Sequence, residues 1–245
     1  MSERTHLIND YLRVNSSVLH NGFHVISEET LKLALHNLQS FERPDMYATL
    51  DDKIIIIEHF EFDASKRTTK GMKGKQEEAL LEQRISAMPM DDEFHLDKGN
   101  YDVSFENWQA NFEQTFNSHY ARISQYKESI RNHLNPDPNI PMLVGFFIEN
   151  QYSPVVYDKN RCGELYYFDT IQFANKMTVS ENLDFVLFGS YYDGCPRIFY
   201  IDRESYTDYR PLIDLTNTNV KLSPVNKNEI TMHGAFGEST IGEKI

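Results

Sequence analysis

Four consecutive isoleucines at residues 54–57 follow a mostly apolar stretch at residues 46–50. Asp51 and Asp52 separate the two stretches, and aspartate is a common turn residue. The pattern therefore predicts an antiparallel hairpin. Because its second strand is apolar on both faces, we expect that strand to be central and covered on both sides of a sheet.

The centre of this turn fixes which residues face each other. With the turn between Asp51 and Asp52, Asp45 lies opposite Glu58, and a two-residue or a four-residue loop gives the same pairing. Carboxylates directly opposite in a sheet have Cβ atoms about 4.5–5.5 Å apart and repel each other. The repulsion is roughly 3 kcal/mol at an effective dielectric of 20 and nearer 1 kcal/mol in water. A bound Mg²⁺ would turn this cost into an attraction.

The same strand has polar residues on both faces near its end. Alternation places Glu58 and Phe60 on one face, and His59, Glu61 and Asp63 on the other. The trio has the chemistry of metal ligands, although at a strand end such residues are more often a solvated edge. A β-bulge near His59 would bring Glu61 to the face of Glu58.

Helical spacing predicts two helices around this hairpin. Ser27 is an expected N-cap, with Glu28 and Glu29 in the first turn, for a helix that ends before Pro44. Aromatic and aliphatic residues recur at helical spacing over residues 105–134, which predicts one long helix. A stripe of this kind is far more often core than a base-stacking platform.

Shorter patterns predict the remaining elements. Val, Leu and Phe residues around Asn21-Gly22 suggest a small hairpin within residues 18–26. Further expected elements are a buried strand at 142–149 beside the first hairpin, paired strands at 153–157 and 164–168, a short helix at 169–177, and a C-terminal hairpin of residues 184–192 and 197–202.

The length and composition favour one globular domain. With 245 residues and 40% hydrophobic residues the chain can bury a large core. We expect a single α/β domain over residues 1–204, with a core at about 27–202, an insertion at about 64–104, and an irregular segment at 205–245. No stretch approaches 18 apolar residues, and the start lacks the apolar core of a signal peptide, so we expect a cytoplasmic protein without membrane contact.

The charge distribution affects whether the protein can bind nucleic acid. The formal charge of −13 repels nucleic acid at long range. A local basic loop at residues 66–75 offsets this repulsion, although a solvated charged loop is an equally good interpretation. Its cationic residues are Lys66, Arg67, Lys70, Lys73 and Lys75.

Pro44-Asp45, a short hairpin and a strand of isoleucines ending in Glu58 resemble the PD-(D/E)-x-K nuclease superfamily. The resemblance implies a restriction-endonuclease-like core, a mixed central sheet flanked by helices, in which Asp45 and Glu58 bind Mg²⁺ or Mn²⁺. The family also places a lysine two residues after the glutamate, where this chain has Phe60, and often an additional acid on the preceding helix, here Glu28 or Glu29.

The resemblance implies a metal-dependent nuclease that hydrolyses phosphodiesters of DNA or RNA. Its catalytic residues would be Asp45, Glu58 and a loop lysine, Lys66 or Lys70, in place of the strand lysine. The basic loop would contact the nucleic acid, and a homo-oligomer or a partner subunit is compatible with the sequence. Phe60 and the net charge favour the alternative, a binding or regulatory protein that has the nuclease fold without its chemistry.

Overall fold

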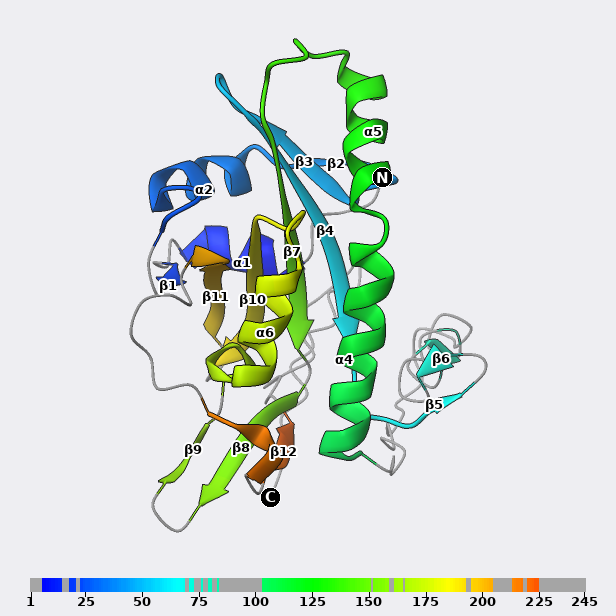
Figure 1. Ribbon diagram of the computed structural model, residues 1–245, viewed down its shortest axis with the longest axis vertical. Helices are drawn as coiled ribbons and strands as arrows, with labels where there is room; N and C mark the ends of the chain where they lie inside the picture. The colour runs from blue at the N-terminus through cyan, green and yellow to red at the C-terminus, as the bar shows by residue number, and fades with distance from the viewer. Residues whose placement is uncertain are drawn as a thin grey trace, which may run out of the picture.

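A mixed β-sheet forms the centre of the protein. The computed structural model describes residues 6–14, 18–20, 23–68, 71–72, 76, 79–80, 83, 103–150, 152–158, 161–164, 166–192, 195–204, 213–217 and 220–224. Within these residues a seven-stranded sheet has the order β1-β11-β10-β7-β4-β3-β2 (Figure 1). Its strands are β1 (Leu19–His20), β2 (Gln39–Ser40), β3 (Met46–Thr49), β4 (Ile54–Phe62), β7 (Met142–Asn150), β10 (Phe185–Tyr192) and β11 (Cys195–Asp202). The predicted α/β class with a mixed sheet is confirmed.

The hairpin of β3 and β4 has the predicted register. Tyr47 pairs with Ile56, and the Leu50 N–H donates to the Lys53 carbonyl at 2.9 Å, which closes the turn. Extending the ladder by one residue beyond Met46 sets Asp45 opposite Glu58.

Strand β4 continues into an uninterrupted parallel ladder with β7. The pairing runs from Ile54 with Met142 to Phe62 with Asn150 without a skipped residue. The bulge that would bring Glu61 round to Glu58 is therefore not formed. β7 also pairs in parallel with β10, and β10 forms the predicted antiparallel hairpin with β11.

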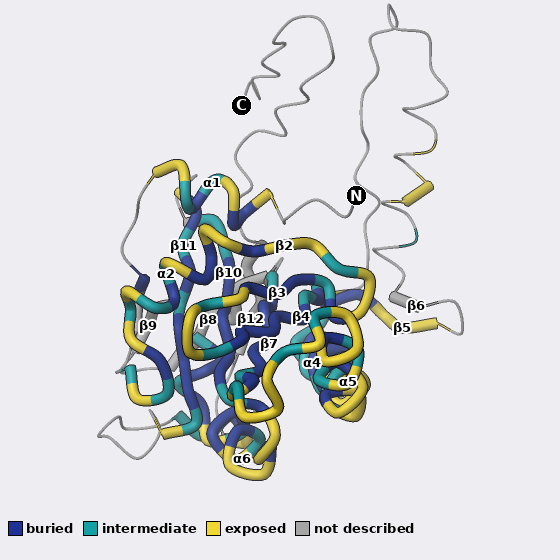
Figure 2. The backbone as a smooth tube through the Cα atoms, turned by 90° about the horizontal axis from the view of Figure 1, so that it is seen from above, coloured by how far each residue is buried: buried dark blue, intermediate teal, exposed yellow. Residues whose placement is uncertain are grey.

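Helices cover both faces of the sheet (Figure 2). Helices α4 (Phe105–Tyr120), α5 (Ile123–Leu134) and α6 (Ile171–Val179) pack on the face that carries Ile54 and Ile56. Helices α1 (His6–Val14) and α2 (Glu28–His36) pack on the face that carries Ile55 and Ile57. Because both clusters are buried, four successive isoleucines in β4 are each accommodated in a core.

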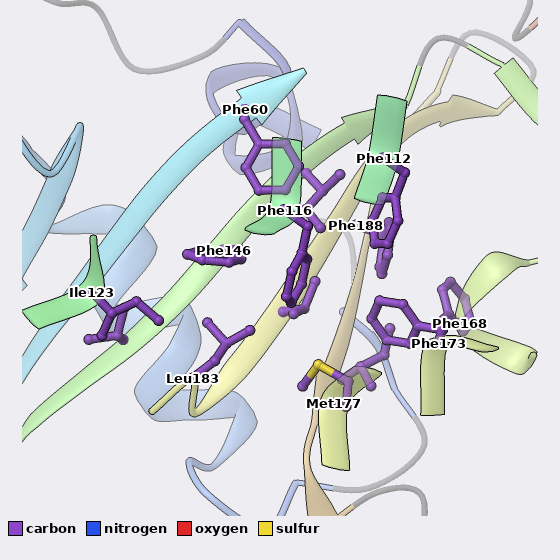
Figure 3. Close-up of a cluster of buried hydrophobic side chains, with 14 of the residues drawn as sticks. Phe60, Phe112, Phe116, Ile123, Phe146, Phe168, Phe173, Met177, Leu183 and Phe188 are labelled. Carbon is purple, nitrogen blue, oxygen red and sulfur yellow. The ribbon is translucent and has the colours of Figure 1, made fainter. Parts of the chain in front are cut away.

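The predicted long helix is wrong in one respect: it is two helices. The chain turns at Ala121 and Arg122, where the Arg122 N–H bonds to the His119 carbonyl in a tightened turn. The aromatic stripe is core, as expected, and Trp108, Phe112 and Phe116 are almost wholly buried. Figure 3 shows Phe60, Phe116 and Phe146 gathered between β4, β7 and α4.

The predicted hairpin at residues 18–26 is wrong. β1 pairs in parallel with β11, and residues 24–26 form a bend. The buried Asp202 carboxylate accepts the N–H groups of His24 and Val25 at 2.8 and 3.1 Å. Asn21 and Gly22, the predicted turn residues, lie outside the described residues.

Two smaller sheets complete the described structure. β12, β8 and β9 form one, and β5 and β6 form the other. The second strand of the predicted 153–157 hairpin begins three residues earlier than expected, and the segment predicted to be irregular after residue 204 contains η3 and β12. Most of the predicted insertion at 64–104 lies outside the described residues. The bounds are β5 (Arg67–Thr68), β6 (Gly71–Met72), β8 (Tyr152–Asp158), β9 (Arg161–Glu164), η1 (Tyr167–Asp169), η3 (Leu215–Asn217) and β12 (Val220–Pro224).

Candidate active site

Glu58 is the centre of a polar network in the middle of β4. Its side chain is only 8% exposed. Oε1 accepts a hydrogen bond from the Tyr126 hydroxyl at 2.8 Å and lies 2.8 Å from Nδ1 of His119. Oε2 accepts the N–H of Asp45 at 3.3 Å. Three groups from outside β4 therefore fix the position of this carboxylate.

Asp45 lies immediately before β3 and is half-buried. Its Oδ2 accepts the N–H of His59 at 2.9 Å, so each acid is bonded to the backbone of the opposite segment. Burial and the negative charge of Glu58 raise the pKa of Asp45, and the His59 N–H bond opposes that rise. The two carboxylates are thus close enough to repel each other, as the register predicted.

His119 and Tyr126 reach Glu58 from the junction of α4 and α5 (Figure 1). His119 lies in the last turn of α4, and Tyr126 lies in the first turn of α5. The turn at Arg122 therefore brings both side chains over the same point of β4. Burial, and then its bond to Glu58, raise the pKa of Tyr126, whereas the nearby Arg122 charge lowers it.

Phe60 occupies the position of the family's lysine. Its ring stacks on the His119 imidazole, with centroids 4.9 Å apart and an interplanar angle of 11°. Phe60 also contacts Phe146 edge to face at 5.6 Å. The imidazole of His119 therefore lies flat on the Phe60 ring while its Nδ1 edge meets Glu58.

Nδ1 of His119 and Oε1 of Glu58 lie within hydrogen-bond distance, and the tautomer of the imidazole decides which nitrogen donates. In the tautomer that carries its proton on Nδ1, the imidazole donates to the carboxylate and Nε2 is left as an acceptor. This arrangement of an acid that orients a histidine is common among general bases.

The proposed loop lysines are placed differently. Lys66 is exposed and lies just before β5, which Figure 1 shows near the N-terminal end of α4, away from the α4–α5 junction. Lys70 lies outside the described residues, as do Lys73 and Lys75. Among the described residues, the basic side chain in contact with Glu58 is the imidazole of His119 rather than a lysine.

The additional acids on the preceding helix are on the other side of the sheet. Ser27 caps α2 as predicted, since its hydroxyl accepts the Thr30 N–H. Glu28 forms an ion pair with Lys32 at 2.9 Å within α2. Because α2 covers the face opposite to α4 and α5, Glu28 and Glu29 do not join Glu58.

A second polar group lies on the opposite face of β4. One ligand atom from each of His59, Glu61 and Glu149 lies within 4.8 Å of the others. Asp63, the third member of the predicted trio, instead accepts hydrogen bonds from the backbone and the hydroxyl of Ser65. Glu149 takes its place from β7, where it is the register partner of Glu61.

Three residues at these sites were not singled out by the sequence patterns. Tyr126 is part of the aromatic stripe, and Glu149 ends the apolar stretch at residues 142–149. His119 gave no signal of its own, because its spacing from Glu58 has meaning only once α4 is folded against β4.

Comparison with known proteins adds no relative. The chain matches no protein-family model, and it has no significant match among curated proteins or solved structures. Among the described residues, no helix is long and apolar enough to cross a membrane. The functional argument therefore depends on the geometry of the site.

Proposed function

We propose that the protein is a divalent-metal-dependent nuclease with a restriction-endonuclease-like core, in which Asp45 and Glu58 bind Mg²⁺ or Mn²⁺. The observation that carries the proposal is the register of β3 and β4, which sets these two carboxylates opposite each other. Burial, and then the negative charge of Glu58, raise the pKa of Asp45, so the ionised form of this acid is not fully stabilised by the surrounding protein. A hard dication fits this pair of oxygen donors.

The element order supports the same proposal. A helix (α2), three antiparallel strands (β2, β3 and β4), helices α4 and α5, and a parallel strand (β7) occur in this order, with the short strands β5 and β6 between β4 and α4. The resemblance implies a core of a helix, three strands, a helix and a strand. Fold alone does not establish function, so the residues at the site must carry the argument.

The side chains around the pair suggest how they would act on a phosphodiester. A metal ion held there would lower the pKa of a bound water and stabilise charge on the phosphate. Tyr126 and His119 hold Glu58 in position for that ion. Nε2 of His119 would accept the proton of the attacking water, a role that the family assigns to lysine. Arg122, exposed at the helix junction, would contact a phosphate.

The substrate class we propose is nucleic acid, DNA or RNA. Lys66 and Arg67 are exposed at the start of the basic loop, and Arg122 is exposed closer to the acids. These cations would supply sequence-independent contacts to the backbone of the nucleic acid. Because the net charge is −13, such binding would depend on these local cations and would be sensitive to salt.

A second candidate function is nucleic-acid or protein binding without catalysis. It is favoured by Phe60 at the lysine position and by the protein hydrogen bonds that both oxygens of Glu58 already make. In this case the Glu58, His119 and Tyr126 network would stabilise the fold alone. The two candidates differ in whether a metal ion binds at Asp45.

The test is cleavage of single- and double-stranded DNA and RNA in the presence of Mn²⁺. We expect the wild-type protein to cleave at least one of these substrates, and Asp45→Asn and Glu58→Gln to lose that activity. Asp52→Asn is the matched control, because Asp52 is an exposed acid in the same hairpin and is paired with Lys53. Cleavage that survives in Asp45→Asn, or none by the wild type, would contradict the proposed function.

A further inference from the structure

The face of β4 opposite Glu58 carries two buried polar atoms without hydrogen bonds. Nε2 of His59 and Oε1 of Glu149 are both inaccessible to solvent, and neither has a hydrogen-bond partner among the described residues. The two atoms lie 3.3 Å apart, within ion-pair distance of each other, but without the geometry of a hydrogen bond. Buried polar atoms in a native protein are nearly always hydrogen-bonded, so this close contact requires an explanation.

Their separation fits two ligands of one metal ion. Zn–N and Zn–O distances are about 2.0–2.1 Å, which places neighbouring ligands of a tetrahedral ion about 3.4 Å apart. Glu61 supplies a third ligand atom, and all three atoms lie within 4.8 Å of one another.

The backbone holds these three side chains in fixed relation. His59 and Glu61 are two residues apart on β4 and share a face. Glu149 is the register partner of Glu61 on the adjacent parallel strand. The side chains of His59 and Glu149 are 22% and 17% exposed, so the group lies close to the surface although its two facing atoms are covered.

The surroundings are acidic. The Tyr191 hydroxyl donates to Asp10 at 2.8 Å, and burial, that bond and the charges of Asp10 and Glu149 raise the pKa of Tyr191. The negative potential at this face therefore extends beyond the three candidate ligands. A cation would relieve it.

We propose that His59, Glu61 and Glu149 form a binding site for a first-row transition-metal dication such as Zn²⁺. Imidazole favours Zn²⁺ and related ions over Mg²⁺, whereas an all-oxygen site favours Mg²⁺. Three protein ligands leave a fourth position for water. The site is separate from Asp45 and Glu58 and does not depend on the nuclease proposal.

The experiment is a Zn²⁺ titration of the full chain, with stoichiometry measured by competition against a chromophoric chelator. We expect the His59→Gln and Glu149→Gln variants each to bind one equivalent of Zn²⁺ fewer than the wild-type protein. His36→Gln is the matched control, because His36 is exposed on α2, and it should keep the wild-type stoichiometry. Asp45→Asn should also keep it.

Circular dichroism and thermal melting would verify that each variant is folded. If a variant at His59 or Glu149 fails to fold, Glu61→Gln reports on the same site from the less buried end of the strand. The proposal is overturned if the folded site variants bind as much Zn²⁺ as the wild type. It is equally overturned if Asp45→Asn, and not His59→Gln, loses the equivalent, since the ion would then belong to the other face.

Discussion

The two faces of β4 contain polar groups of different kinds. On the face toward α4 and α5, Glu58 is within hydrogen-bond distance of three protein groups. Its negative charge also repels that of Asp45, which lies opposite. On the face toward α1 and α2, His59 and Glu149 have buried atoms that make no hydrogen bond within the described chain. The first site is preorganised by hydrogen-bonding side chains, whereas the second is organised by strand register and by the packing of His59 on Phe147.

This difference separates two ways of building a cation site on one strand. Supporting side chains such as His119 and Tyr126 hold a ligand in place before an ion binds, which favours chemistry. Strand register places ligands close together, but their side chains reach coordination geometry only when the ion binds. We therefore expect catalysis at the first face and metal binding without catalysis at the second.

Of the substitutions that test this difference, one at His119 should have the largest effect, on the cleavage rate. His119→Gln should lower the cleavage rate by about 10²–10⁴-fold, the usual contribution of a general base. His133→Gln on α5 is the matched control, because His133 is exposed and bonds to Tyr47 rather than to an acid. Equal rates for the two variants would remove His119 from the mechanism.

A smaller effect is expected at Tyr126. Tyr126→Phe removes a hydroxyl that donates to a buried carboxylate, and such a bond contributes about 1.5–3 kcal/mol to the free energy of unfolding. Tyr47→Phe is the control, since its hydroxyl donates to the neutral Gln39 and should cost about 1 kcal/mol. Urea unfolding measures both. A loss at Tyr126 no larger than that at Tyr47 would show that Glu58 is not charged and buried as described.

Asp45→Asn should stabilise the protein without added metal by about 1 kcal/mol, after allowance for solvent screening of a half-buried pair. Because burial and Glu58 raise the pKa of Asp45 in the folded state, its ionised form weakens folding at neutral pH. The advantage of asparagine should therefore shrink as the pH falls through the raised pKa and vanish below the ordinary value of 3.8. Urea unfolding at several pH values checks this, and an advantage independent of pH would contradict it.

The smallest effect tests whether the two faces are independent. His119 and Glu149 lie on opposite sides of the sheet and share no hydrogen-bond, ion-pair or ring-contact partner among the described residues. Their effects on the free energy of unfolding should add within about 0.5 kcal/mol. A larger coupling in the double variant would show that the two polar groups form one network through β4.

The sequence predicted the hairpin because its information is local. Two aspartates between apolar strands fix the turn, and the turn fixes the pairing of Asp45 with Glu58. It did not predict His119, whose contact with Glu58 spans 61 residues and depends on the break between α4 and α5. That break has neither proline nor glycine to mark it.

The same limit explains the N-terminal error and the second polar group. Asn21-Gly22 is a strong local turn signal, but the bonds from Asp202 to His24 and Val25 link residues far apart in the sequence. Glu149 likewise joins His59 only through the parallel pairing of β7 with β4. Strand alternation indicated His59 and Glu61 but had no means of identifying a ligand from another strand.

The central claim is that Asp45 and Glu58 share a cation. The most direct measurement is the melting temperature with and without Mn²⁺ in the His59→Gln background, which removes the imidazole ligand of the opposite face. Mn²⁺ at about 100 times its dissociation constant should add about 2.7 kcal/mol to the free energy of unfolding. The account predicts that this rise disappears when Asp45→Asn or Glu58→Gln is added. An equal rise in all three proteins, or none in His59→Gln itself, would contradict it.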